Sequence, residues 1–174
     1  MALRNVITEG DPALRRKSRA VGEVTDRIRE ILGDMVDTMR ESNGVGLAGP
    51  QIGIMRRLFV AEPNPEADPP VVYYMIDPEI YEEEGSEIDD EGCLSVPGLI
   101  GTVERPERIR IRAKDLNGEL QDYEFEGFEA RIMCHEYDHL NGILYIDKAT
   151  DVREPSYEED EEELEDEVEL EETE

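Results

Sequence analysis

The chain has only two histidines, and they lie four residues apart in the segment His135-Glu-Tyr-Asp-His139. Residues four apart on an α-helix lie on the same face, one turn above each other. Asn141-Gly142 follows closely, and glycine commonly ends a helix. The sequence therefore predicts a helix over about residues 128–141 that carries both imidazoles on one face.

Two imidazoles at this spacing can bind one metal ion. The carboxylate of Glu136, next to the first imidazole, could then take a proton from a bound water. The same pattern also arises by chance in a pair of surface histidines. The short segment alone does not distinguish these cases, so the rest of the chain has to supply the remaining ligands.

A catalytic metal site normally has three protein ligands and one open position. No suitable ligand follows His139, because the acidic residues beyond residue 150 lie in a low-complexity segment. Upstream, Cys93 lies in Glu91-Gly-Cys-Leu-Ser95, and the nearby glycines and Pro97 predict that this cysteine is in a loop. A buried free cysteine without a ligand role is the other interpretation. A structural zinc site is disfavoured, because such sites have four protein ligands and the sequence offers three.

The charge of the chain is unevenly distributed. The formal net charge is −28, and residues 154–174 contain 14 acidic residues and no lysine or arginine. Like charges repel and few apolar side chains are present there, so we predict a disordered acidic tail over residues 151–174 after a catalytic domain over residues 1–150. We expect no direct nucleic-acid binding from so acidic a chain.

The sequence shows no sign of a membrane segment or a secretion signal. No run of about 18 or more apolar residues occurs, and the N-terminus lacks the apolar stretch of a signal peptide. We therefore expect a cytoplasmic protein. In a reducing compartment Cys93 and Cys134 should stay free, and a metal or catalytic role is favoured over a disulfide.

Apolar periodicity predicts most of the other elements. A stripe at helical spacing predicts a core helix ending near Asn43-Gly44, with the members Ile28, Ile31, Leu32, Met35, Val36 and Met39. The alternating segment 108–114, the turn signal Asn117-Gly118 and residues 120–125 predict a β-hairpin, whose arginines should lie beside acidic neighbours. Strands are also predicted at 58–61 and 71–76, and a glycine-rich loop at 44–51 that lets backbone approach a substrate.

Three segments of the chain together resemble the peptide deformylase family. They are Gly44-Val-Gly-Leu-Ala-Gly-Pro-Gln51, Glu91-Gly-Cys-Leu-Ser95 and His135-Glu-Tyr-Asp-His-Leu140, and the resemblance runs from about residue 3 to residue 148. It implies an α+β fold in which antiparallel β-strands pack around a central C-terminal helix carrying the His-Glu-x-x-His metal motif. It also implies a metal-dependent hydrolase that removes the N-formyl group from the N-terminal methionine of newly made polypeptides and releases formate.

The resemblance assigns a role to each matching residue. The metal would be held by Cys93, His135 and His139, and Glu136 would be the general acid and base. The formyl oxygen would be held by the side-chain amide of Gln51 and the backbone N–H of Leu94. The extended peptide would meet the backbone of Val45 and Gly46. The methionine side chain needs an apolar pocket, for which the candidates are Ile132, Cys134 and Leu99.

Acidic residues near the ligands are expected to support them. Metal-bound histidines usually donate their second N–H to a carboxylate or a carbonyl. We therefore expect Glu91 and Asp138 to form bonds near the site, with Arg105 as a partner. A plain surface salt bridge is an equally good interpretation of Arg105.

The resemblance also implies a cofactor and partners. One divalent metal ion is expected, Fe²⁺ in the cell and Zn²⁺, Ni²⁺ or Co²⁺ in some preparations, because a thiolate ligand makes zinc a weaker Lewis acid. The substrate would be a nascent formyl-Met polypeptide, with a transient ribosome contact, and we expect a monomer that does not contact a membrane. A deformylase-like amidase acting on a different formylated amine would carry the same motifs. A non-catalytic peptide binder is disfavoured, since it needs neither Glu136 nor Gln51.

Overall fold

The computed structural model describes residues 2–156. The elements follow one another in the order η1 (Pro12–Arg15), α1 (Asp26–Glu41), β1 (Gly46–Ala48), η2 (Gly49–Ile52), β2 (Leu58–Ala61), β3 (Tyr73–Glu84), β4 (Glu87–Cys93), β5 (Val96–Arg105), β6 (Arg108–Lys114), β7 (Leu120–Glu126), α2 (Gly127–Leu140), η3 (Tyr145–Asp147) and β8 (Thr150–Arg153), where η marks a short 3-10 helix.

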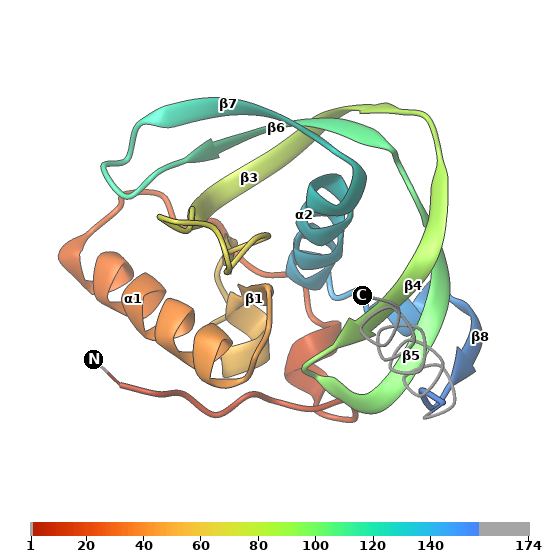
Figure 1. Cartoon of the computed structure of the whole chain (residues 1–174). Helices are drawn as coiled ribbons and strands as arrows, with labels where there is room; N and C mark the ends of the chain where they lie inside the picture. Colours follow the sequence, from red (N-terminus) through yellow and green to blue (C-terminus); the bar gives the residue numbers. More distant parts are fainter. Residues whose placement is uncertain (1, 157–174) are drawn as a thin grey trace, which may run out of the picture.

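The strands form two antiparallel sheets. One sheet has five strands in the order β1-β2-β3-β6-β7, and the other has three in the order β4-β5-β8. Helix α2 lies in the middle of the molecule, under β3, β6 and β7 and beside β4 and β5 (Figure 1). The predicted α+β fold, with antiparallel strands around a central C-terminal helix, is confirmed.

Helix α2 is central because its apolar side chains fill the space under the five-stranded sheet. Met133 packs there with Phe59, Met75 and Ile111, and all four are completely buried. In a second cluster, the predicted apolar stripe of α1 packs against Leu47 and against the opposite face of β2 and β3. Helix α1 begins at the N-cap Thr25 and ends at Glu41, close to the predicted end.

The outer face of the five-stranded sheet carries rows of opposite charge. On β6, Ile109 and Ile111 are buried, whereas the arginines between and beside them are exposed. Arg110 lies 3.3 Å from Glu82 of β3 and 3.2 Å from Glu124 of β7. The arginines of this strand are thus flanked by acids on both sides, as the sequence predicted, and they do not form a free basic surface.

The three-stranded sheet was not predicted from the sequence. Strand β4 is mostly exposed and acidic and has no alternating apolar pattern, and β5 contains a proline and two glycines. The predicted strand 71–76 was also too short, because β3 continues through a positive-φ residue, Asp77, to Glu84. Strands 58–61 and 108–114 and the hairpin turn at Gly118 agree with prediction.

The predicted boundary after residue 150 falls inside β8. Arg153 pairs with Ile100 of β5, so residues 151–153 belong to the three-stranded sheet. The larger part of the predicted tail, residues 157–174, lies outside the described residues. Between residues 2 and 156, no helix is long and apolar enough to cross a membrane.

The end of α2 depends on a glycine, as the sequence predicted. The N–H of Gly142 donates to the carbonyl of His139 (3.1 Å), and the N–H of Ile143 donates to the carbonyl of Asp138 (3.0 Å), which is the Schellman arrangement. Gly142 has φ +73, and a Cβ there would lie 2.5 Å from the backbone oxygen of Arg15. Both the backbone conformation and the close approach of the N-terminal segment therefore require glycine.

Gly142→Ala should destabilise the protein more than Gly118→Ala. Both sites have a similar positive φ, but the nearest atom to a Cβ at Gly118 is 3.8 Å away. The variants therefore share the cost of the left-handed conformation, and only Gly142→Ala adds a backbone clash. We expect an additional loss of about 1–3 kcal/mol, measured by thermal or urea unfolding. Equal losses would show that the contact with Arg15 is unimportant.

Candidate metal centre

A cavity of about 490 Å³ opens at the junction of the two sheets. Its walls come from the segment around β1, from the end of β4 and the turn after it, and from one face of α2. The lining includes Val45, Gly46, Gln51, Cys93, Leu94, Phe128, Ile132, His135 and Glu136. The three segments that carried the family resemblance therefore meet at one place.

Three potential metal ligands gather at the base of this cavity. The Sγ atom of Cys93 and ring nitrogens of His135 and His139 all lie within 4.8 Å of one another. His135 and His139 lie one turn apart on α2, as predicted. The prediction of a loop at Cys93 was wrong, because Cys93 is the last residue of β4, where the pairing with β5 shifts register after Gly92.

The ring of His135 is oriented by Glu91. Nδ1 of His135 lies 2.8 Å from Oε1 of Glu91, and a carboxylate only accepts hydrogen bonds, so Nδ1 carries the proton. In the neutral ring the other nitrogen, Nε2, then has the lone pair that a metal needs. His139 turns its Nε2 toward Cys93, 3.4 Å from Sγ. Its Nδ1 is buried without a hydrogen-bond partner among the described residues.

Glu91 itself is held by two buried arginines. Arg105 donates from Nε to Oε2 (2.8 Å) and from Nη2 to Oε1 (2.9 Å), and Arg131 donates from Nη1 to Oε2 (2.7 Å). Burial raises the pKa of Glu91, but the hydrogen bonds from Arg105 and His135 outweigh it, and the pKa falls far below its usual range. Glu91 is therefore a permanent anion behind the metal ligands.

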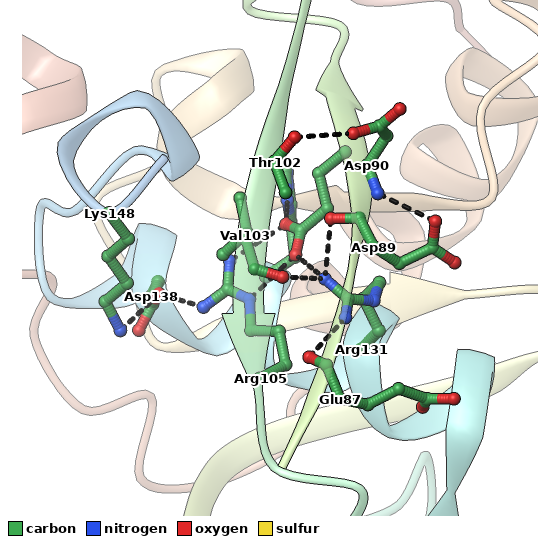
Figure 2. A network of polar contacts seen from close by, with 11 residues as sticks. Glu87, Asp89, Asp90, Thr102, Val103, Arg105, Arg131, Asp138 and Lys148 are labelled. Atoms are coloured by element: carbon green, nitrogen blue, oxygen red, sulfur yellow. Dashed lines mark hydrogen bonds and ion pairs between the residues drawn. The ribbon is translucent and has the colours of Figure 1, made fainter. Parts of the chain in front are cut away.

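Arg105 continues the network to the end of α2. Its Nη1 donates to Oδ2 of Asp138 (2.6 Å), which also meets Lys148 at 2.9 Å; Figure 2 shows Arg105, Asp138 and Lys148 in line. The predicted support from Glu91, Asp138 and Arg105 is confirmed, and Arg105 is fully enclosed instead of lying on the surface. Asp138 contacts Arg105 and not a histidine ring. Sequence reasoning missed Arg131, whose only signal is its place one turn before His135.

Glu136 points into the cavity without a cationic partner. Its side chain is buried, Oε2 has no hydrogen-bond partner in the described part of the chain, and a Cβ on Gly46 would lie 2.7 Å from Oε1. Burial raises the pKa of Glu136 to about 7, with opposing effects from the charges of His135 and Glu91. A carboxyl group of this kind can both accept and release a proton near neutral pH.

The side-chain amide of Gln51 has a fixed orientation. Its Oε1 accepts a hydrogen bond from the N–H of Ala48 (2.9 Å), and its Nε2 donates to Oγ of Ser95 (3.0 Å) and lies 3.5 Å from Sγ of Cys93. One amide hydrogen is therefore bonded to Ser95, and the other faces the thiol of Cys93. The short helix η2, directly after β1, places Gln51 there.

The apolar part of the cavity differs from the sequence prediction. Ile132 lines it, together with Val45, Leu94, Pro97 and Phe128. Cys134 instead faces the core between α2 and the five-stranded sheet, and Leu99 packs in the cluster beneath the three-stranded sheet. Both cysteines are free thiols.

Comparisons with known proteins agree on one family. The sequence model described as polypeptide deformylase matches residues 3–155. Peptide deformylase 1 of Clostridium perfringens is 48% identical over 147 residues, which are 84% of this chain and 98% of that relative. The crystal structure of peptide deformylase from Thermotoga maritima is 36% identical with a TM-score of 0.82, covering 86% of this chain and 99% of that one. A Met-Ala-Ser-bound peptide deformylase from Acinetobacter baumannii is 35% identical with a TM-score of 0.78, covering 84% and 98%.

The two cysteines provide a test of the metal centre. We expect the purified protein to bind one divalent ion per chain, Cys93→Ala to lose most of that binding, and Cys134→Ala to keep it. The reason is that Cys93 Sγ faces both imidazoles, whereas the thiol of Cys134 is in the core. Metal content after dialysis, measured by elemental analysis, checks this. Full metal content in Cys93→Ala would remove the thiolate from the ligand set.

Proposed function

This chain belongs to the polypeptide deformylase family, and we propose that its Cys93, His135 and His139 hold the metal while Glu136 moves the protons of the reaction. The enzyme removes the N-formyl group from the N-terminal methionine of new polypeptides and releases formate. The observation that carries the assignment of residues is the position of Glu136, a buried carboxyl group with an unpartnered oxygen beside three convergent metal ligands.

The ligand set fits one divalent cation. A thiolate and two imidazoles within 4.8 Å of one another are typical ligands of zinc and iron, and they leave a coordination position open. When bound, the cation would act as a Lewis acid and lower the pKa of a coordinated water toward neutrality. We propose Fe²⁺ as the native ion, because the charge donated by the Cys93 thiolate makes zinc a weaker Lewis acid.

Glu136 is the proton carrier of the proposed mechanism. It takes a proton from the water that attacks the formyl carbon, and the carbonyl carbon becomes tetrahedral. When the bond between that carbon and the methionine nitrogen breaks, Glu136 gives the proton to the leaving amine. Water and the formamide thus become formate and a free N-terminus, and Glu136 is ready for the next cycle.

Two neutral donors stabilise the negative oxygen in this mechanism. The Nε2 group of Gln51 faces the ligands because its own carbonyl is committed to Ala48, and the backbone N–H of Leu94 follows Cys93 directly on the cavity wall. Donors already in place need no reorganisation during the reaction, and the loss of one typically costs ~10²–10³ in kcat.

The substrate peptide fits along β1. In the sheet of the described residues β1 pairs only with β2, so its other edge is available. An extended peptide can add to such an edge through backbone hydrogen bonds, which would involve Val45 and Gly46. The apolar walls at Ile132 and Phe128 suit a methionine side chain. The Acinetobacter baumannii relative bound to Met-Ala-Ser supports the choice of a methionine peptide as the substrate.

We place the reaction in the cytoplasm, where the substrate is made, and propose a monomer that meets nascent chains at the ribosome. The domain assignment stays a proposal of the same kind, with the predicted boundary at residue 150 moved past β8: the catalytic domain includes β8 (Thr150–Arg153), and the acidic segment after it lies outside the chemistry. Support comes from the family match, which ends at residue 155.

Glu136→Gln should abolish turnover and keep the metal. We expect kcat/KM for formyl-Met-Ala-Ser to fall by ~10²–10⁴, measured as formate release by anaerobically prepared Fe²⁺ protein. The control is Glu129→Gln, an exposed glutamate on the same helix, which should leave turnover unchanged. Near-normal turnover in Glu136→Gln would contradict the role of Glu136. No turnover by metal-loaded wild type would direct attention to other formylated amines.

Gly46→Ala should also reduce turnover, because the new Cβ would displace the carboxylate of Glu136 from its place beside β1. The matched variant is Gly44→Ala, whose Cβ would lie 2.8 Å from the tip of the Leu94 side chain, which can move at little cost, and at an ordinary 3.6 Å from the carbonyl oxygen of Gly46. We expect at least a tenfold larger loss of kcat in Gly46→Ala (about 1.4 kcal/mol). Similar losses in the two variants would contradict a specific contact between Gly46 and Glu136.

A further inference from the structure

The proposed ligands belong to two different parts of the fold. Cys93 ends β4 of the three-stranded sheet, whereas His135 and His139 lie on α2, whose apolar side packs under the five-stranded sheet. The distance between thiol and imidazoles therefore depends on how the β4–β5 pair sits against α2. The contacts that cross this junction near the ligands are mainly polar.

Arg131 crosses the junction at the end of the site farther from Cys93. It projects from α2, and its guanidinium donates to Oε2 of Glu91 (2.7 Å), to the carbonyl of Val103 on β5 (2.9 Å) and to the carbonyl of Glu87 on β4 (2.9 Å). Figure 2 shows these contacts converging on the β4–β5 pair. The side chain is only 6% exposed, so water does not replace these partners.

We propose that Arg131 is a positioning residue that fixes β4 and β5 against α2 and thereby sets the place of Cys93 and the orientation of His135. The inference rests on the metal site proposed above. Arg131 acts on His135 through Glu91, which accepts the Nδ1–H of the ring, and on Cys93 through the backbone of the strand that ends there. Its guanidinium is hydrogen-bonded to Glu91 and to strand carbonyls and, within residues 2–156, to none of the proposed metal ligands.

The chemistry of the three acceptors explains why arginine is needed. A guanidinium presents a planar fork of five donors and stays charged, so it can serve a carboxylate and two carbonyls together. Arg105 does not replace it, because Arg105 is itself on β5 and reaches α2 only at Asp138. Without Arg131, Glu91 loses one of its hydrogen bonds and both strands lose their link to the helix turn before His135.

The test compares metal binding in Arg131→Met and Arg4→Met. Both changes remove an arginine from a pair with a buried carboxylate, but Arg4 pairs with Asp34 on α1, and neither of those residues lines the cavity. Co²⁺ is the probe, because its visible spectrum reports the thiolate ligand and the coordination geometry. Its dissociation constant is measured by chelator competition on the substrate-free protein, and Tm is measured on the same samples.

Removal of groups that orient metal ligands typically costs 10–100-fold in affinity. We expect about that increase in the Co²⁺ dissociation constant for Arg131→Met, with an altered spectrum, and less than about a threefold change for Arg4→Met even where its Tm falls. Arg131→Lys keeps the charge but not the fork, so it should fall between wild type and Arg131→Met. If Arg131→Met does not fold, Arg131→Lys decides by the same two measurements.

Two outcomes would overturn the inference. The first is that Arg131→Met binds Co²⁺ with the affinity and the spectrum of the wild type. If only Arg131→Lys folds, the same result in that variant counts. Arg131 would then contribute to stability and not to the metal site. Equal weakening in Arg4→Met would mean that any loss of stability lowers metal affinity. Failure of the wild-type protein itself to bind Co²⁺ would instead contradict the proposed metal site, so the two failures are distinguishable.

Discussion

The carboxylate of Glu91 is the interaction on which the rest of the site depends. It accepts hydrogen bonds from Arg105, Arg131 and His135, which come from β5 and α2, while Glu91 belongs to β4. A buried anion is tolerated only when it is paired and fully hydrogen-bonded. Any arrangement of the helix and the three-stranded sheet that separated these groups would leave an unpaired buried charge, and this penalty selects one arrangement.

The charges around the metal ligands divide the carboxylates by role. Glu91 and Asp138 are matched by Arg105 and Arg131, so neither carboxylate depends on a cationic His135 for its pairing. Among residues 2–156, by contrast, Oε2 of Glu136 has no hydrogen-bond partner. A carboxylate held by arginines remains ionised and supports structure, whereas one in an apolar site with a free oxygen can exchange a proton. Two similar side chains thus obtain different functions from their surroundings.

Sequence reasoning reached the elements whose burial is periodic. Helix α1 and strands β2 and β6 have apolar faces that alternate at the right spacing, whereas β4 has mostly exposed acids and was missed. The ligands and Glu136 came from motifs at recognisable separations, with the family resemblance assigning their roles. Arg131 could not be found this way, because no local pattern says which strand a helix residue will face. The wrong prediction of a loop at Cys93 has the same origin, because glycine and proline residues beside the end of a strand give the sequence pattern that is typical of a loop.

The division of the proposed ligands between β4 and α2 would also make a bound cation a cross-link. Cys93 and His139 are 46 positions apart in the chain, so an ion held by both would tie two distant segments together in the folded state and would stabilise that state over the unfolded chain. When the free concentration of an ion is 100 times its dissociation constant, its binding adds about 2.7 kcal/mol to the free energy of unfolding. Loss of the ion, for example after oxidation of the thiolate, would therefore remove the catalytic centre and loosen the junction of the two sheets in one event.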